Sequence, residues 1–196
     1  MKNFALNANF IRQSAFVIIS VVLLFPVQQL NAQSLGKMTD KRDGKTYETV
    51  KMGEKVWIAQ NLNYESPDSW CYADKPEYCA EYGRLYTWKA AMNACPAGWS
   101  LPTDADWVAL EKVNGGVEKA GANLMRGGSS GFNATLGGIR CTDGVFVNQG
   151  AYGDYWTSTT DVVGNAYMRY FFVQHKKLYR ISFHKDTGRS VRCVKD

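Results

Sequence analysis

One pentapeptide in this chain has the spacing of a catalytic serine turn. Residues 127–131 read Gly-Gly-Ser-Ser-Gly and match the Gly-x-Ser-x-Gly pattern of enzymes with a serine nucleophile. The acid and the base of a triad follow in the order of the α/β-hydrolases, as Asp143 or Asp154 and then His175 or His184. Such a turn needs a buried strand before it and a helix after it. The flanking Leu-Met-Arg and Gly-Phe-Asn tripeptides predict neither, so we expect a flexible glycine-serine loop without a nucleophile.

The other reactive side chains do not form a recognisable site either. His175 and His184 are the only two histidines, and they lie nine positions apart in strand-like segments, so a zinc site would lack its third and fourth ligands. A glycosidase needs two carboxylates at a set separation, and the 18 acidic residues contain no distinctive pair. We therefore predict no metal site, no cofactor and no enzymatic activity.

The elements that surround these residues begin with two short helices. An apolar stripe at helical spacing predicts a first helix over residues 85–94, which Pro96 ends because a proline disfavours helical geometry in the residue before it. The stripe consists of Leu85, Trp88, Met92 and Cys95. Trp99 and Leu101 then alternate with Ser100 as in a short, half-buried strand.

A second helix is predicted over residues 103–113. Thr103 is a good N-cap, and Asp106 three residues later completes a variant of the capping box. Its buried stripe is Trp107, Leu110 and Val113. Across the domain, we expect eight side chains to be buried: Trp88, Met92, Trp99, Leu101, Trp107, Leu110, Trp156 and Val191.

The rest of the chain predicts antiparallel strands and one long loop. Two strands of an antiparallel ribbon are predicted near the start of the domain. The first follows the Asp-Gly turn at 43–44, where alternate residues point to opposite faces, and the second follows the turn at 53–54. Later strands are predicted near 139–141, 145–147, 155–159, 166–173, 177–183 and 190–195. The glycine-rich stretch 114–138, which lies between the second predicted helix and the later strands, predicts a long irregular loop. Because long ordered loops often bind ligands, Phe132, Phe146 and Tyr152 are the candidate ligand-binding residues.

The N-terminus predicts export. Residues 1–32 have the positive start, the apolar run and the small-residue end of a secretory signal peptide. The apolar run is shorter than the ~20 residues that a membrane-spanning helix needs, so we expect no span after cleavage. A short segment, 33–39, then precedes a single domain over 40–196, and the protein should be secreted, periplasmic or on the cell surface.

Charge argues against a nucleic-acid partner. After removal of Lys2 and Arg12 with the signal peptide, 21 basic residues remain against 18 acidic ones, and no basic stretch forms a stripe or a recognition helix. Cys71 and Cys79 bracket a seven-residue loop that contains Pro76. Because no further cysteine or histidine lies nearby, a local disulfide is expected there in an exported protein.

Five motifs in this order resemble the Fibrobacter succinogenes major paralogous domain family. They lie at 43–47 (Asp-Gly-Lys-Thr-Tyr), 57–64 (Trp-Ile-Ala-Gln-Asn-Leu-Asn-Tyr), 82–88 (Tyr-Gly-Arg-Leu-Tyr-Thr-Trp), 95–102 (Cys-Pro-Ala-Gly-Trp-Ser-Leu-Pro) and 190–196 (Ser-Val-Arg-Cys-Val-Lys-Asp). The resemblance implies an exported bacterial domain without an established activity. It also implies an α+β, C-type lectin-like fold, in which Cys95 and Cys193 pair. Cys141 departs from this pattern as a fifth, unpaired cysteine, and we expect it to be a buried thiol rather than part of an intermolecular bridge.

Two sequence features limit what this resemblance implies for function. Residues 155–159 read Tyr-Trp-Thr-Ser-Thr where sugar-binding lectins carry calcium ligands, so no calcium cage is expected. Formylglycine-generating enzymes share the lectin-like scaffold, but they need a reactive cysteine pair, and the cysteines here are better explained as structural disulfides. We expect a non-catalytic binding or adhesion module with a protein or carbohydrate ligand, or alternatively a structural subunit of an extracellular assembly.

Overall fold

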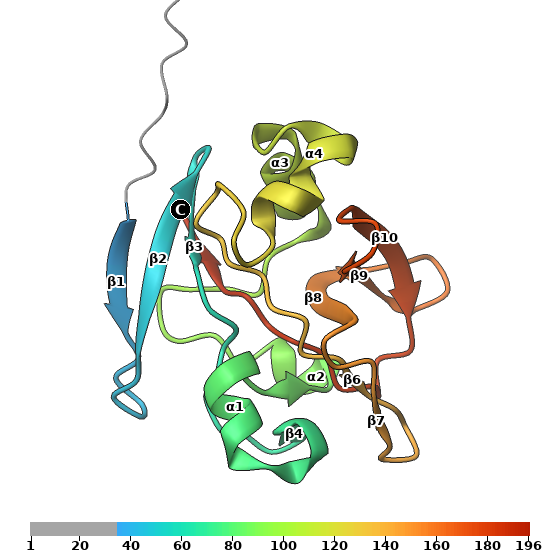
Figure 1. Cartoon of the computed structure of the whole chain (residues 1–196). Coiled ribbons are helices and arrows are strands. Elements are labelled where there is room, and N and C mark those ends of the chain that lie inside the picture. The colour runs from blue at the N-terminus through green and yellow to red at the C-terminus, as the bar shows by residue number, and fades with distance from the viewer. Residues whose placement is uncertain (1–34) are drawn as a thin grey trace, which may run out of the picture. The chain divides into compact units, whose positions relative to one another are not determined.

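The computed structural model describes residues 35–196, and the predicted signal peptide lies outside the described residues. Strand β1 (Leu35–Thr39) pairs with β2 (Thr46–Met52), and β2 pairs with β3 (Lys55–Ile58) across the predicted turn at 53–54. The last strand, β11 (Val194–Lys195), adds to β3, with Val194 opposite Trp57. All three pairings are antiparallel, and they bring the C-terminal strand β11 into one sheet with the N-terminal strands β1 to β3 (Figure 1).

A second antiparallel sheet has the order β10-β9-β8. It consists of β8 (Tyr152–Thr160), β9 (Ala166–Phe172) and β10 (Leu178–Phe183), close to the predicted bounds. Its inner face carries Tyr155, Phe171 and Leu178 toward helix α3 (Asp104–Val113). Two small antiparallel pairs complete the strands: β4 (Ser69–Trp70) with β5 (Leu85–Tyr86), and β6 (Ile139–Arg140) with β7 (Phe146–Val147).

Helix α3 confirms the second predicted helix. The Thr103 hydroxyl accepts a hydrogen bond from the Asp106 N–H, and the Asp106 carboxylate accepts one from the Thr103 N–H, which completes the capping box. Trp107 and Leu110 are buried as expected. Val113 is 55% exposed, so its place in the buried stripe was wrongly predicted: the helix ends there and its last turn faces solvent.

The first predicted helix is much shorter than its stripe indicated. Leu85 lies in β5, and only α2 (Trp88–Ala91) is helical, because the Thr87 side chain accepts the Ala90 N–H and starts the helix there. The chain leaves helical structure before Met92, which is 41% exposed and not buried as predicted. Leu85 pairs in a strand, so the helical spacing of the apolar residues did not predict the structure at this position.

Two further helices lie where the sequence predicted loops. Helix α1 (Pro76–Tyr82) follows a short 3-10 turn, η1 (Tyr72–Asp74), and has Pro76 at its first position, where a missing N–H costs nothing. Helix α4 (Gly116–Leu124) occupies part of the predicted loop 114–138. A Cβ at Gly121 would lie 2.2 Å from the Lys176 carbonyl oxygen, so this glycine permits close helix packing rather than a loop.

The core is rich in aromatic side chains. Trp57, Trp107 and Phe132 meet edge to face, with ring centroids 5.2 to 5.8 Å apart. Of the eight side chains predicted to be buried, five are: Leu101, Trp107, Leu110, Trp156 and Val191. Trp88 and Trp99 are half-buried instead, because they pack on the rim of the core. Among residues 35–196, no helix is long and apolar enough to span a membrane.

Candidate binding surfaces

Phe132 is not a ligand-binding residue, which corrects the prediction from the sequence. Its side chain is fully buried between Trp57 and Trp107. The buried Ser130 hydroxyl accepts the Phe132 N–H and turns the chain inward at this point. The loop after α4 therefore contributes a core residue rather than an exposed ring.

Phe146 and Tyr152, the other two candidates, are half-buried and lie in different settings. The Phe146 ring packs beside Tyr72, with centroids 5.4 Å apart, and near the Arg140 guanidinium. Tyr152 lies on the outer face of the β8–β10 sheet. The structure thus does not gather the three predicted residues into one site.

The serine-containing pentapeptide lacks the surroundings of a nucleophile. Ser129 is exposed, and its hydroxyl lies 3.2 Å from the Asn123 Oδ1 atom. The segment before it is the end of α4 rather than a strand. His175 contacts the Tyr179 hydroxyl at 2.8 Å, and Asp154 pairs with Arg189. In the described part of the chain, Ser129, His175 and Asp154 therefore contact other partners and do not form a triad.

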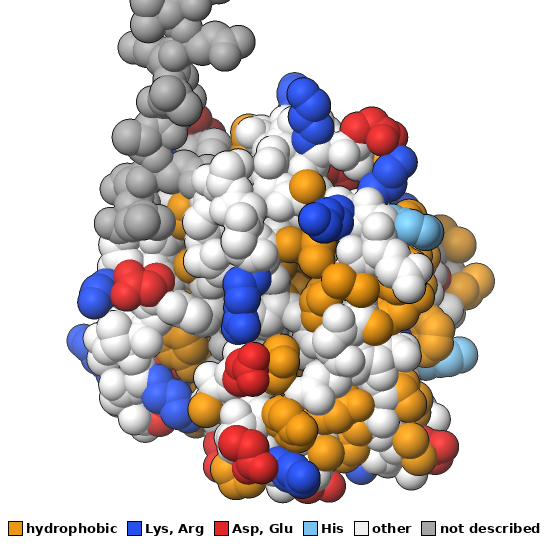
Figure 2. Space-filling view, in the orientation of Figure 1, with side chains coloured by type: hydrophobic (Ala, Val, Ile, Leu, Met, Phe, Trp, Pro, Cys, Tyr) orange, Lys and Arg blue, Asp and Glu red, His pale blue; other side chains and the backbone are white. Residues whose placement is uncertain are grey.

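Tyr152 belongs to a group of apolar and aromatic side chains that we call the aromatic face: Tyr152, Tyr170, Phe172, Tyr179, Ile181 and Phe183. Strand alternation places them on the side of the sheet opposite α3. Tyr152 stacks on Phe172 with centroids 4.6 Å apart, and Tyr170 stacks on Tyr179 at 4.8 Å. Ile181 and Phe183 are 41% and 39% exposed. In Figure 2, hydrophobic side chains gather over this part of the surface.

An ion pair lies beneath the aromatic face. Arg189 donates to the Asp154 carboxylate, and both side chains are almost completely buried. The guanidinium also packs 4.6 Å from the Phe183 ring centroid. Burial raises the pKa of Asp154 to about 6, although the neighbouring Arg189 acts in the opposite direction. The base of this face can therefore change its charge in mildly acidic solution.

A hollow of about 580 Å³ forms a groove beside α1. Its walls come from β2, from the segment after β3, from α1 and from the loop that follows α4. Its polar lining residues are Lys45, Thr46, Gln60, Asn61, Asn63, Glu81, Arg126, Asn133 and Thr135. No sequence pattern signals this groove, because its walls come from segments that are far apart along the chain.

A buried polar network braces the floor of the groove. The Asn61 amide donates to the Tyr82 carbonyl, to Thr135 and to Ser190, and its oxygen accepts from Arg192. Arg192 is fully buried and also donates to the carbonyls of Ile58, Phe132 and Asn133. Desolvation lowers the pKa of Arg192 to about 10, so it stays charged at neutral pH.

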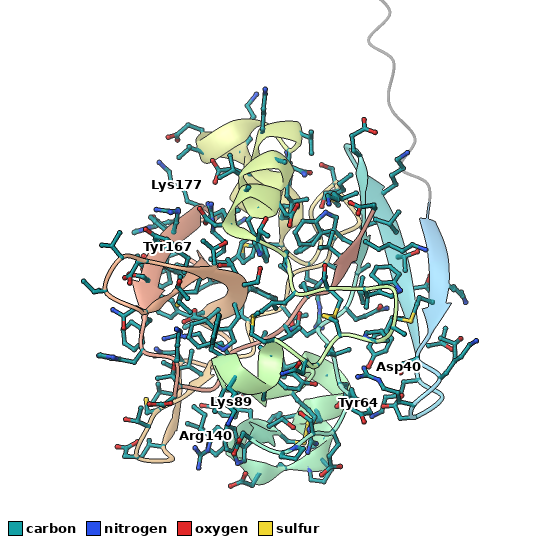
Figure 3. All side chains as sticks on the ribbon, turned by 180° about the vertical axis from the view of Figure 1, so that it is seen from behind. Asp40, Tyr64, Lys89, Arg140, Tyr167 and Lys177 are labelled. Atoms are coloured by element: carbon teal, nitrogen blue, oxygen red, sulfur yellow. A yellow bond between two sulfur atoms is a disulfide. The ribbon has the colours of Figure 1, made fainter. Side chains whose placement is uncertain are left out.

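The structure contains both expected disulfides. Cys71 pairs with Cys79 across the start of α1, and Cys95 pairs with Cys193 next to the last strand. Cys141 is the free cysteine of the described residues, and it is half-buried rather than buried. Figure 3, seen from behind, shows Asp40 and Tyr64 near each other, where Arg42 pairs with Asp40 and lies 3.6 Å from the Tyr64 ring centroid.

These features define a disulfide-containing α+β domain whose described part offers an aromatic face and a polar groove. Within residues 35–196, no group of three or more histidine, cysteine or acidic side chains could hold a metal ion. Over residues 50–195 the chain matches the family model described as the Fibrobacter succinogenes major domain, and it belongs to this family, which has no assigned function. No curated protein and no solved structure matches the chain.

Most residues of the aromatic face lie in segments that the sequence predicted as strands. Tyr170 and Phe172 alternate with buried residues in the predicted strand 166–173, and Tyr179 and Ile181 alternate in the predicted strand 177–183. The alternation of apolar residues in these two strands is therefore a signal for this face, although it does not show that the face is partly exposed.

Proposed function

We propose that this protein is a non-catalytic binding or adhesion module, and that the aromatic face is its main contact surface. The observation that supports this is a cluster of six apolar and aromatic side chains, partly exposed on a rigid antiparallel sheet. Tyrosine is among the residue types that contribute most energy to protein interfaces, because it buries a large area at a small cost in side-chain entropy.

The stacking of the rings favours a protein partner over a carbohydrate at this face. A sugar ring is best held by an open aromatic ring face. Here Tyr152 stacks on Phe172, and Tyr170 stacks on Tyr179. The two pairs also adjoin each other, because the ring centroid of Tyr152 lies 6.0 Å from that of Tyr170, and His175 packs against Phe172, so few ring faces stay open. What remains for a partner is ring edges and hydroxyl groups, together with Ile181 and Phe183, which suit the mixed surface of another protein.

We further propose that the protein acts outside the cytoplasm, secreted, periplasmic or on the cell surface. Two disulfides indicate an oxidising environment, and the N-terminal sequence has the pattern of a signal peptide. A C-type lectin-like arrangement is also a proposal. It is supported by the pairing of β11 with β3 and by the disulfide from Cys95 to Cys193, which joins the segment after α2 to the last strand.

A second possible function is that of a structural subunit of an extracellular assembly. The observation that favours it is the exposure of Ile181 and Phe183 on the aromatic face, since exposed apolar patches also mediate self-association. The two proposals share a surface and differ in the partner, which is a second copy in one and a different molecule in the other.

The test measures self-association and binding with one pair of variants. Ile181→Glu places a charge within the aromatic face, and Val108→Glu places one on exposed α3 as the matched control. Labelled mature protein is titrated onto cell envelopes of the source organism, and its mass is measured by light scattering. Saturable binding by a monomer that only Ile181→Glu abolishes supports recognition, and a dimer or polymer that only Ile181→Glu dissociates supports assembly. An equal loss with both variants contradicts the use of this face.

A further inference from the structure

We propose that the groove beside α1 is a second binding site, separate from the aromatic face, and that it binds a neutral oligosaccharide. Three hollows share lining residues and form one track along α1. The central groove shares Lys45, Asn63 and Cys79 with a hollow of about 550 Å³, and it shares Arg126 and Thr135 with one of about 340 Å³. The track is therefore long enough for a chain of several residues rather than a single small molecule.

The charges along the track cancel one another. Lys45 pairs with Asp43 at 3.0 Å, Arg84 pairs with Glu65 at 2.9 Å, and Arg126 pairs with Glu81 at 3.4 Å. Within residues 35–196, two charged lining residues, Asp74 and Lys176, have no ion pair; they have opposite signs and line the two outer hollows. An anionic ligand would have to compete with these carboxylates, so the electrostatics favour an uncharged ligand.

The unengaged polar groups of the central groove are amides. Among the hydrogen bonds of the described residues, the Asn63 side chain makes none, and Gln60 uses only its oxygen, which accepts the Glu48 N–H. Asn133 uses only its nitrogen, which donates to the Gly131 carbonyl. A side-chain amide both donates and accepts hydrogen bonds, and this matches a hydroxyl group, which does the same.

An aromatic ring lies at each end of the track. Trp70 lines the hollow on one side, and Tyr82 lines the hollow on the other. Both side chains are half-buried, and the Arg140 guanidinium covers Trp70 at 4.0 Å from the ring centroid. Tyr82 borders an open hollow, where an apolar sugar face can lie against its ring, and Trp70 can offer only the ring face that Arg140 leaves free.

The groove is formed before a ligand arrives. Asn61 and Arg192 fix its floor through seven hydrogen bonds to surrounding residues and to each other. Gly83 lies so close to this floor that a Cβ there would come within 2.6 Å of the Asn61 Cβ atom. Fixed walls reduce the entropy cost of binding, which matters for a ligand held mainly by hydrogen bonds.

An extended peptide fits the central groove less well. Peptides bound in grooves are selected by pockets for alternate side chains. The apolar lining here is limited to small or buried groups, chiefly Ala59, Ala80 and Tyr47, so no such pocket exists between the ends of the track. Side-chain amides with free hydrogen-bonding groups, balanced charges and an aromatic ring at each end of the track therefore favour a neutral oligosaccharide over a peptide.

The experiment screens the mature, disulfide-bonded protein on an array of neutral glycans, with sulfated and uronic-acid glycans on the same slide, and measures the affinity of the best glycan by calorimetry. Asn63→Ala and Gln60→Ala should each weaken binding about fivefold to tenfold, as expected for the loss of one hydrogen bond. Gln174→Ala, an exposed amide far along the chain between β9 and β10, is the matched control and should bind like the wild type.

Three results would overturn the proposal. They are binding of anionic glycans alone, no binding to any neutral glycan, and binding that Asn63→Ala and Gln60→Ala leave unchanged. Because Ile181→Glu should not affect glycan binding, failure at the groove and failure at the aromatic face are distinguishable. Unchanged melting temperatures of the two groove variants show that they remain folded, as expected for side chains that make few internal contacts.

Discussion

The aromatic face and the groove differ in what lies beneath them. Each rests on a buried arginine, and both arginines come from the C-terminal segment that crosses the domain before β11 (Figure 1). Arg189, under the aromatic face, pairs with the Asp154 carboxylate. Arg192, under the groove, donates to three carbonyls and to the Asn61 oxygen, all of them uncharged.

This difference separates two ways to stabilise a buried cation. Partial charges on several carbonyl oxygens do not titrate, so the groove floor should be indifferent to pH. A carboxylate supplies a full opposite charge, but burial makes its ionisation costly, and the pKa of Asp154 rises to about 6. The aromatic face should therefore respond to acid, and the groove should not.

The largest effect is expected where the two surfaces share a support. Cys193→Ser removes the disulfide to Cys95, which closes a loop with a sequence separation of 98 and holds the segment that carries both arginines. The loss should be about 4 to 5 kcal/mol in the chain-entropy model. Cys79→Ser opens a separation of only 8 and should cost less. Thermal unfolding of both variants checks this, and equal losses would contradict a shared support.

The next effect separates the two arginines. Arg192→Met leaves several buried oxygens without a donor and should cost about 3 kcal/mol or more, equally at pH 5 and pH 8. Arg189→Met leaves a buried carboxylate unpaired and should cost about 3 to 5 kcal/mol at pH 8. The cost should be smaller at pH 5, because Asp154 is then protonated. Urea unfolding at both pH values measures these losses of stability. An identical pH dependence in the two variants would contradict the proposed difference between Arg189 and Arg192.

The sequence could predict what depends on local pattern. The capping box of α3, the hairpin turns and the strands of the second sheet follow from residues that are close in the chain. Leu85 could not be placed in this way, because its strand partner, Trp70, lies 15 positions earlier. Gly121 was predicted to lie in a loop for a related reason: its lack of a side chain permits a contact with Lys176, which is distant in sequence.

The surfaces show the same limit. Of the predicted ligand-binding residues, Tyr152 lies on the aromatic face, whereas Phe132 fills the core, because its ring meets two tryptophans from separate segments. The groove depends on Asn61, whose partners come from three other parts of the chain. The spacing of residues along the sequence does not indicate such an arrangement, so this hydrogen-bond network could be found only in the three-dimensional structure.

A third prediction concerns pH in the unmodified protein. Because the folded-state pKa of Asp154 is raised above its unfolded value, its contribution to stability is fully present below about pH 4 and is lost as the pH rises through about 6. The stability of the wild type minus that of Asp154→Asn should therefore fall by about 3 kcal/mol between pH 4 and pH 7. Asp40 and Asp161 have lowered pKa values, so their contributions to stability change with pH in the opposite direction. Both proteins contain these two carboxyls, so their contributions cancel when the two stabilities are subtracted. A constant difference, measured by denaturant unfolding, would show that Asp154 titrates normally.

The smallest effect is expected at Cys141, next to the aromatic face. Its thiol lies close enough to Arg189 to affect the arginine electrostatically, but it is half-buried and forms no disulfide in the described structure. Cys141→Ser keeps the size of the side chain and should change the free energy of unfolding by less than about 1 kcal/mol. Val145→Ser, in the same hairpin and 53% exposed, is the control. A much larger loss for Cys141→Ser alone would mean that the thiol helps to hold Arg189, and that the aromatic face depends on more than its carboxylate.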